Sequence, residues 1–218
     1  YKEGKKMTTS CRPAFVNMIK QHFPMLLDNM STTVSPMCGV SRMIKAEDPE
    51  TVTVFIGPCI AKKSETMDLN IQGNADYAMT LGEIRAMMRA KGVELEPEEN
   101  TLQNGSVFGK RFGNGGGVTA AVLQCLKEQG ENADINVMKC NGAAECKKAL
   151  LLMKVGKLPA DFVEGMACVG GCVGGPSKHK TEQEAKKARD TLIGQADKRE
   201  VHENLGHYPM DKFSMHRH

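Results

Sequence analysis

Apolar and polar residues follow two different periods along the chain, and the two periods alternate. Residues 51–57 (TVTVFIG) form a short, apolar, β-branched run, which predicts a buried strand. Shorter runs of this kind predict further strands at 75–79, 134–140 and 161–164. Apolar residues at helical spacing predict helices at about 13–23, 35–46, 80–92, 118–129, 143–155 and 181–198. This alternation predicts an α/β fold with parallel sheets flanked by helices.

Start signals support several of these helices. Pro13 fits the first turn of a helix, and Ser35, directly before a proline, is a typical N-cap. Thr80 and Glu83 have the spacing of a capping box. The glycine-rich stretch 113–117 precedes another predicted helix, but no P-loop lysine and Ser/Thr follow it. We therefore expect this stretch to serve close packing rather than phosphate binding.

Two predicted strands run directly into cysteine-bearing loops. The strand at 51–57 continues into PCIAKKSE and places Cys59 just beyond its carboxyl end. The strand at 161–164 continues into EGMACVGGCVGGP, which carries Cys168 and Cys172. Ligand sites in open α/β sheets collect at the carboxyl ends of strands. If the two strands are neighbours in one parallel sheet, these three thiols converge at one edge.

Composition and charge narrow the class of protein. The 218 residues are 40% hydrophobic, enough for a core, and the formal net charge of +3 is small. No basic stripe with interleaved aromatics is present, so we expect no nucleic-acid partner. No apolar run is long enough to span a membrane and no signal peptide is visible, so we expect no membrane partner. The chain begins at Tyr1 rather than Met, so we expect a piece of a longer protein.

Cysteine usage indicates a reducing compartment. Eight cysteines in a chain of this size are too few for a dense disulfide scaffold. Together with 15 methionines they favour a cytoplasmic protein whose thiols are free, metal-binding or catalytic.

Converging thiols on glycine-rich loops can hold zinc or an iron–sulfur cluster. Structural zinc usually uses pairs of cysteines about two residues apart, and this chain has no C-x-x-C pair. Its histidines lie mostly in the C-terminal tail, where a solvated end is a simpler interpretation than a zinc site. Cysteines on separate glycine-rich loops favour the larger cluster. A zinc-binding or metal-free structural module is the alternative.

Three motifs follow one another along the chain: TSCRP at 9–13, GPCIAKKSE at 57–65 and EGMACVGGCVGGP at 164–176. In length, spacing and order they resemble the cluster-binding motifs of the iron-only ([FeFe]) hydrogenases. The resemblance implies that residues 1–178 are the C-terminal portion of such a catalytic domain, with cluster-binding loops at the carboxyl ends of parallel strands. A charged helix and a polar tail follow at 179–218.

The resemblance also implies a cofactor, the H-cluster, in which a 4Fe–4S cube is linked to a two-iron unit that carries CO and cyanide. Cys59, Cys168 and Cys172 match three of the four cysteine ligands, and Cys172 matches the bridging one. Lys62 matches the lysine that donates a hydrogen bond to a cyanide, a strong charge-assisted contact. The residues implied to lie beside the cofactor are Met166, Pro36 and Pro58.

Proton and electron transfer are implied in the same way. Cys11 matches the cysteine that passes protons to the cluster, and its place at a helix start favours the thiolate. Ser31 matches the next relay position. The implied reaction is the reversible conversion of two protons and two electrons into H2. The implied electron source is a ferredoxin-like carrier or upstream iron–sulfur domains, and we expect the isolated chain to turn over hydrogen poorly.

Arg12 departs from the family pattern, because it stands where the family has its fourth cube ligand. Arginine stays protonated and does not ligate iron. Three interpretations are open: the loop shifts so that Cys11 becomes a ligand, the cube is held by three thiolates, or the protein is a non-catalytic or sensory iron–sulfur homologue. Gly57 also replaces a methionine and leaves space beside the cofactor.

Other residues near the motifs have plain structural interpretations. Cys140 and Cys146 flank a predicted strand–helix junction, and we predict one buried cysteine on each element rather than a metal site. Lys63 and Glu65 are predicted to be a solvated loop pair. Whether Glu164 ties down its own loop is left open.

Overall fold

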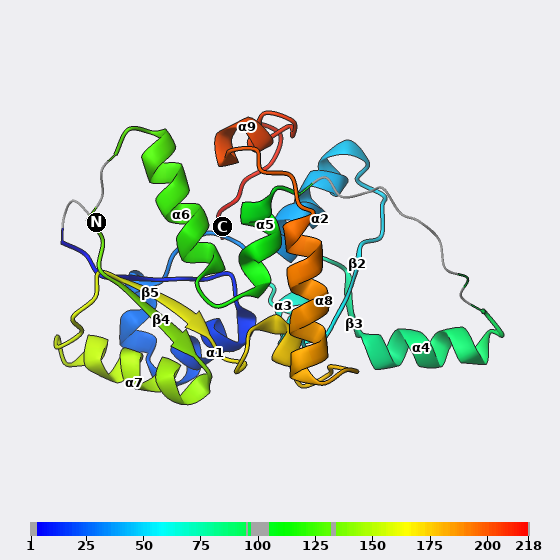
Figure 1. Ribbon diagram of the computed structural model, residues 1–218, viewed down its shortest axis with the longest axis horizontal. Coiled ribbons are helices and arrows are strands. Elements are labelled where there is room, and N and C mark those ends of the chain that lie inside the picture. Colours follow the sequence, from blue (N-terminus) through cyan, green and yellow to red (C-terminus); the bar gives the residue numbers. More distant parts are fainter. Residues whose placement is uncertain (1–3, 95, 97–104, 132–133, 218) are drawn as a thin grey trace.

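The computed structural model describes residues 4–94, 96, 105–131 and 134–217 (Figure 1). Its strands are β1 (Met7–Thr8), β2 (Val54–Gly57), β3 (Tyr77–Thr80), β4 (Val137–Asn141) and β5 (Phe162–Met166). They form two separate parallel sheets, a first sheet in the order β1-β5-β4 and a second sheet of β2 beside β3. The predicted α/β class with parallel sheets flanked by helices is confirmed.

Helices connect the strands and cover the sheets. The α-helices are α1 (Pro13–His22), α2 (Pro36–Glu47), α3 (Ala61–Thr66), α4 (Leu81–Ala90), α5 (Val107–Lys110), α6 (Gly117–Glu128), α7 (Ala143–Lys154), α8 (Glu182–Gly194) and α9 (Val201–Leu205). The short 3-10 helices are η1 (Pro24–Asn29), η2 (Arg111–Gly113) and η3 (Cys172–Gly174). Within the described ranges, no helix is both long and apolar enough to cross a membrane.

The main hydrophobic core lies on the first sheet. Phe15 and Ile19 of α1, Leu150 of α7 and Val163 of β5 are fully buried in one cluster. Figure 1 shows α1 and α7 on one side of this sheet and α6 on the other. Because α1 buries one apolar face against the sheet, its N-terminus and the TSCRP motif before it are held in a fixed position.

The predicted helix starts are confirmed. The Ser35 side chain accepts a hydrogen bond from Cys38 N at 3.3 Å and so caps α2. Thr80 and Glu83 form the predicted capping box of α4. These local signals fix where the helices begin, independently of the tertiary packing.

All four predicted strands are present, and each has a boundary that differs from the predicted one. The strand predicted from residue 51 begins at Val54, and Thr53 is instead held by the Asp76 carboxylate, which accepts from its backbone N at 2.7 Å. The strand predicted to end at residue 164 continues to Met166, because it pairs with β4 as far as Asn141.

The two strands that precede the cysteine loops are not neighbours. β2 pairs with β3, whereas β5 lies between β1 and β4 in the other sheet. The expected convergence at the edge of one shared sheet is therefore wrong. The cysteine loops meet instead through contacts of their own.

The C-terminal segment packs onto α2 and the loop before it. Arg42 Nη1 donates to the carbonyls of Ser214 at 2.5 Å and His216 at 2.7 Å. Val34 N donates to the Met215 carbonyl at 2.8 Å. Residues 214–216 are thus anchored on the body of the protein, while the side chains of His202, His207 and His216 are exposed, as expected for a solvated end. A division between 1–178 and 179–218 stays a prediction.

Candidate metal centre

Loops from the two sheets meet at Pro58 and Gly175. The Pro58 carbonyl, directly before Cys59, accepts a hydrogen bond from Ser177 N at 3.3 Å. A Cβ on Gly175 would lie 2.6 Å from the same carbonyl oxygen, so only glycine permits this approach. The contact brings the loop of Cys172 beside Cys59.

The same loop packs against the glycine-rich turn before α6. Gly171 has φ +87°, and a Cβ there would lie 2.5 Å from the Gly113 carbonyl oxygen. A Cβ on Gly113 would in turn lie 3.8 Å from Cys172 Cβ. The prediction that the stretch 113–117 serves close packing is confirmed.

The thiols of Cys59, Cys168 and Cys172 lie in one region, and each is partly exposed. Burial raises the pKa of Cys168, the neighbouring thiols of Cys59 and Cys172 raise it further, and Arg12 lowers it. As positioned, no group of three or more His, Cys, Asp or Glu side chains within the described residues would hold a single metal ion.

Arg12 reaches this centre from the N-cap of α1, with its side chain 11% exposed. Its Nη1 donates to Cys172 Sγ at 3.7 Å. Its Nη2 donates to the carbonyls of Phe112 at 2.5 Å and Asn114 at 3.4 Å, and lies 3.5 Å from Glu164 Oε1. A guanidinium therefore contacts the Cys172 thiol and lies close enough to that of Cys168 to lower its pKa.

Glu164 on β5 is the buried acidic partner, with 1% of its side chain exposed. Oε1 accepts from Gly116 N at 3.0 Å, and Oε2 accepts from Thr119 N at 2.9 Å and Thr119 Oγ1 at 2.7 Å. The carboxylate thus caps the first turn of α6, where the helix dipole favours negative charge. Glu164 fixes α6 and Arg12 rather than its own loop, a long-range role that no local sequence pattern indicates.

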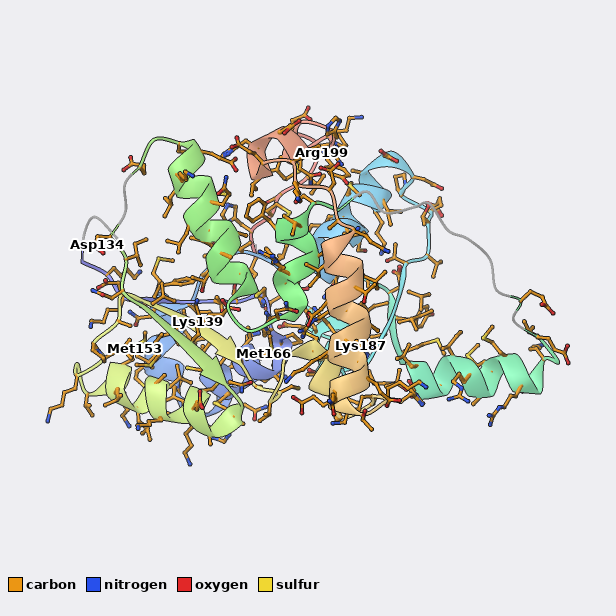
Figure 2. The ribbon with its side chains drawn as sticks, viewed as in Figure 1. Asp134, Lys139, Met153, Met166, Lys187 and Arg199 are labelled. Carbon is orange, nitrogen blue, oxygen red and sulfur yellow. The ribbon has the colours of Figure 1, made fainter. Side chains whose placement is uncertain are left out.

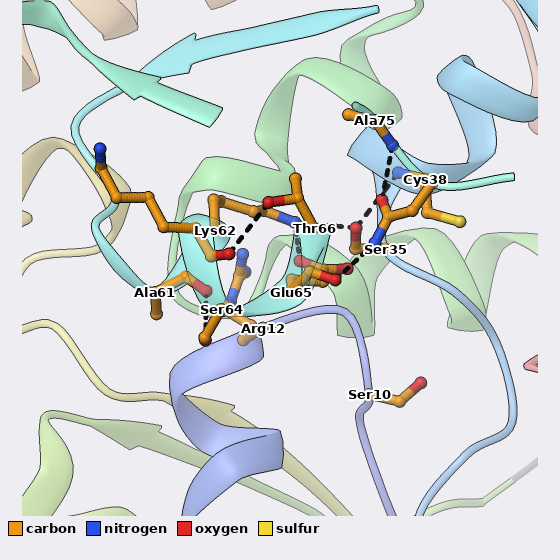
Figure 3. A network of polar contacts seen from close by, with 12 residues as sticks. Ser10, Arg12, Ser35, Cys38, Ala61, Lys62, Ser64, Glu65, Thr66 and Ala75 are labelled. Atoms are coloured by element: carbon orange, nitrogen blue, oxygen red, sulfur yellow. Dashed lines mark hydrogen bonds and ion pairs between the residues drawn. The ribbon is translucent and has the colours of Figure 1, made fainter. Parts of the chain in front are cut away.

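Lys62, Glu65 and Ser35 form a second buried polar group, drawn together in Figure 3. Lys62 Nζ donates to Glu65 Oε2 at 2.6 Å and to Ser35 Oγ at 2.8 Å. Glu65 is only 4% exposed, so its predicted solvated pair with Lys63 is wrong, and Lys63 pairs at the surface with Glu83 instead. The three-residue spacing of Lys62 and Glu65 on α3 is the signal that was available for this pair.

The two predicted proton-relay residues lie in different surroundings. Burial raises the pKa of the Cys11 thiol, and the opposing effect of Arg12 is smaller. The expected thiolate at this helix start is therefore wrong, because desolvation is the largest influence on the Cys11 thiol and favours its neutral form. Ser31 lies between η1 and α2, where its Oγ donates to Thr33 Oγ1 at 3.1 Å.

The remaining predicted residues fall into two groups. Pro36 begins α2 directly after Ser35, and Met166 is buried at the end of β5. Cys140 on β4 and Cys146 on α7 are both buried, which confirms their structural interpretation. A hydrogen bond from Cys146 lowers the pKa of Cys140.

The chain offers three of the four cysteine ligands that the H-cluster cube requires and lacks the fourth. Three thiols on loops that meet are the residues that could hold three corners of a cube, but Arg12 supplies no fourth iron ligand. Among the residues that the structure describes, no partner accepts a hydrogen bond from the buried Arg12 Nε. This donor is therefore available to an acceptor outside the described residues.

Two curated proteins that are similar to this chain in sequence are hydrogenases, the class that the three motifs resemble. Iron hydrogenase 1 of Clostridium pasteurianum is 30% identical, over 91% of this chain and 44% of the relative. The Periplasmic [Fe] hydrogenase large subunit of Nitratidesulfovibrio vulgaris is 29% identical, over 77% of this chain and 50% of the relative. A probable cytosolic Fe-S cluster assembly factor of Brugia malayi is 24% identical, over 84% and 51%. The chain thus spans about half the length of these relatives.

Solved structures agree with the fold. The [FeFe]-hydrogenase structure described as HydA(deltaEFG) matches with a TM-score of 0.68 and 24% identity, over 92% of this chain and 69% of that one. A variant of HydA1 from Chlamydomonas reinhardtii matches with a TM-score of 0.67, also at 24% identity, over 92% and 69%. The family model described as "Iron only hydrogenase large subunit, C-terminal domain" matches residues 1–176. With its three motifs and its fold in agreement, the chain belongs to the family formed by the C-terminal domain of the iron-only hydrogenase large chain.

Proposed function

We propose that Cys59, Cys168 and Cys172 hold an iron–sulfur cluster. The observation that carries this proposal is the contact between the two cysteine loops, in which Ser177 N donates to the Pro58 carbonyl at 3.3 Å and the loop of Cys172 lies beside Cys59. The glycine contacts at Gly171 and Gly175 support it, because they bring loops from separate sheets together.

We further propose that this site serves the reversible conversion of protons and electrons into H2 in a longer protein. The H-cluster, when bound, supplies the metal chemistry of that reaction. The chain itself would supply thiolate ligands, the buried cation of Lys62 and the buried Met166 side chain. Pro36, which is exposed, and Pro58, which is half-buried, are proposed to lie beside the cofactor by resemblance to the family. Cys11 and Ser31 are proposed proton-relay positions by resemblance to the family.

Electrons would come from a ferredoxin-like carrier or from iron–sulfur domains elsewhere in the longer protein. The chain spans only about half the length of the curated relatives it matches. We therefore expect the isolated chain to show no steady hydrogen turnover, even when its cluster is in place.

Arg12 favours a second candidate function, a non-catalytic iron–sulfur protein that keeps the fold and loses the hydrogen chemistry. One relative carries the name of a cytosolic Fe-S cluster assembly factor, so the family includes members named for other roles. The two candidates share the cluster and differ in the two-iron unit.

Anaerobic reconstitution with iron and sulfide tests cluster binding. Cys59→Ser, Cys168→Ser and Cys172→Ser should each reduce bound iron and the visible absorption of the cluster. Cys125→Ser, on α6 and outside the site, is the matched control and should leave both unchanged. Full iron loading in all three serine variants, or zinc in place of iron in anaerobically prepared protein, would contradict the proposal.

Infrared spectroscopy separates the two candidate functions. The longer protein, matured anaerobically, should show CO and cyanide bands and should evolve H2 with a reduced dye if it is a hydrogenase. A cluster without these bands, and without H2, would establish the non-catalytic alternative.

A further inference from the structure

The Arg12 side chain joins segments that lie far apart in the sequence. Its acceptors belong to the turn before α6, to β5 and to the cysteine loop at η3. We propose that Arg12 takes the structural place of the fourth cluster ligand, as a guanidinium bridge between these segments, and that the site consequently offers three thiolates. The bridge is a property of the cluster-free protein, whereas the ligand count rests on the proposed function.

The chemistry of the guanidinium suits this bridging role. A planar fork of donors can contact several acceptors at once in fixed directions, which the point charge of a lysine does not do. Arg12 uses the fork for two backbone carbonyls, the Glu164 carboxylate and the Cys172 sulfur. The two carbonyls and the carboxylate belong to segments that surround the thiols. By joining these segments to Cys172, Arg12 acts as a positioning residue for the cysteine loop.

The backbone around Arg12 argues against a shift that would make Cys11 the missing ligand. The Arg12 carbonyl accepts from Phe15 N and Val16 N, both at 3.0 Å, and so begins α1. On the other side, Thr9 N donates to a β5 carbonyl at 3.0 Å. A one-residue shift would break both sets of hydrogen bonds, which makes it unfavourable.

Three thiolates leave one corner of a cube without a cysteine, since such a cluster is normally held by four. An iron at that corner has no protein ligand in this chain and is the one most easily lost. The expected product of reconstitution is accordingly a cluster with about three retained iron atoms, next to the guanidinium.

Hydrogen exchange on the cluster-free protein tests the bridge. Arg12→Ala should raise amide exchange about tenfold or more across 113–119 and 168–175, because the acceptors of the bridge lose their shared donor. Arg12→Lys should restore part of the protection, since it returns the charge without the fork.

Arg42→Ala is the matched control. Arg42 is also buried, and its guanidinium donates to three carbonyls, but it contacts the C-terminal segment rather than the cysteine loop. The control should leave exchange across 113–119 and 168–175 unchanged. Unchanged exchange in Arg12→Ala, or an equal rise in both variants, would overturn the bridge.

Iron counting and electron paramagnetic resonance test the ligand count. After anaerobic reconstitution and mild oxidation, the wild-type chain should hold about three iron atoms and show the signal of a three-iron cluster. Arg12→Cys should hold about four and lose that signal, because an oxidised four-iron cube is diamagnetic.

The outcomes separate the inference from the proposed function. A stable four-iron cluster in the wild-type chain would overturn the three-thiolate site and leave cluster binding intact. If neither wild type nor Arg12→Cys bound iron, the proposed function and the ligand count would both fail, and the exchange experiment alone would decide the bridge.

Discussion

The two sheets of this protein differ in how well they are packed. The first sheet carries a continuous core in which Phe15 and Leu150 are fully buried. The second sheet leaves large apolar side chains in solvent, with Val54 and Ile56 each 46% exposed and Tyr77 62% exposed. In Figure 2, the side chains of α4, the helix that follows β3, project away from the body at one end of the molecule.

The difference shows which part of the chain determines the geometry of the metal centre. Parallel sheets are normally covered on both faces, and within the part of the chain that the structure describes only the first sheet meets that condition. Cys168 and Cys172 follow the well-packed β5, whereas Cys59 follows the exposed β2. In the candidate metal centre, two thiols follow a well-packed strand and one follows an exposed strand. The loop contacts at Pro58 hold the two loops together.

Core truncation in the first sheet should have the largest effect. Phe15→Ala removes a fully buried ring and should lower the free energy of unfolding by about 3–5 kcal/mol. Urea denaturation of the cluster-free protein measures this value. A loss below about 1 kcal/mol would show that α1 is not part of the principal core.

Removal of the guanidinium should have the next largest effect. Arg12→Ala leaves the buried Glu164 carboxylate without its cation and should cost about 3 kcal/mol of unfolding free energy. Glu164→Gln combined with Arg12→Ala should cost less than the sum of the single changes, because the two groups interact. Strict additivity in this double-mutant cycle would refute the pairing.

Truncation on the second sheet should have a small effect. Ile56→Ala removes a side chain that is already half exposed and should cost less than about 1 kcal/mol. The same denaturation experiment as for Phe15→Ala provides a direct comparison. A cost equal to that of the core variant would mean that this face is buried in solution.

The smallest expected effect is the pH dependence of stability that Asp76, next to the second sheet, contributes. Hydrogen bonds from Lys45 and Thr53 lower the pKa of Asp76 from 3.8 to about 2. Because the folded state binds this proton less tightly, Asp76 stabilises the protein above pH 3.8, and this contribution disappears as the pH falls toward 2. Exposure limits it to below about 1 kcal/mol.

Asp76→Asn provides the matched measurement. The difference in unfolding free energy between wild type and this variant should shrink as the pH is lowered from about 5 toward 2. A difference that stays constant over this range would show that the carboxylate is not held in the folded state.

Local sequence signals predicted much of the fold. The Ser35 cap and the Thr80–Glu83 capping box depend on residues three apart, so the pattern alone contains them. No local pattern shows that β2 and β5 belong to different sheets. This depends on which strands pair, and the pairing strands are far apart in the sequence.

The sequence indicates the three candidate thiols of the site but not the contacts of the charged side chains around them. The glycine-rich cysteine loops point to Cys59, Cys168 and Cys172 as candidate ligands, and their role stays a prediction. The contacts of Arg12 with Phe112 and Cys172 span 100 and 160 residues, and no spacing rule relates them. Burial of Cys11 likewise depends on tertiary packing, which is why the expected thiolate was wrong.

Anomalous diffraction at the iron edge, on crystals of the anaerobically reconstituted chain, is the decisive measurement of the three-thiolate centre. We expect iron density that contacts the sulfurs of Cys59, Cys168 and Cys172, with the Arg12 guanidinium beside the corner that lacks a cysteine. Iron bound to Cys11, or iron located away from these three sulfurs, would contradict this arrangement.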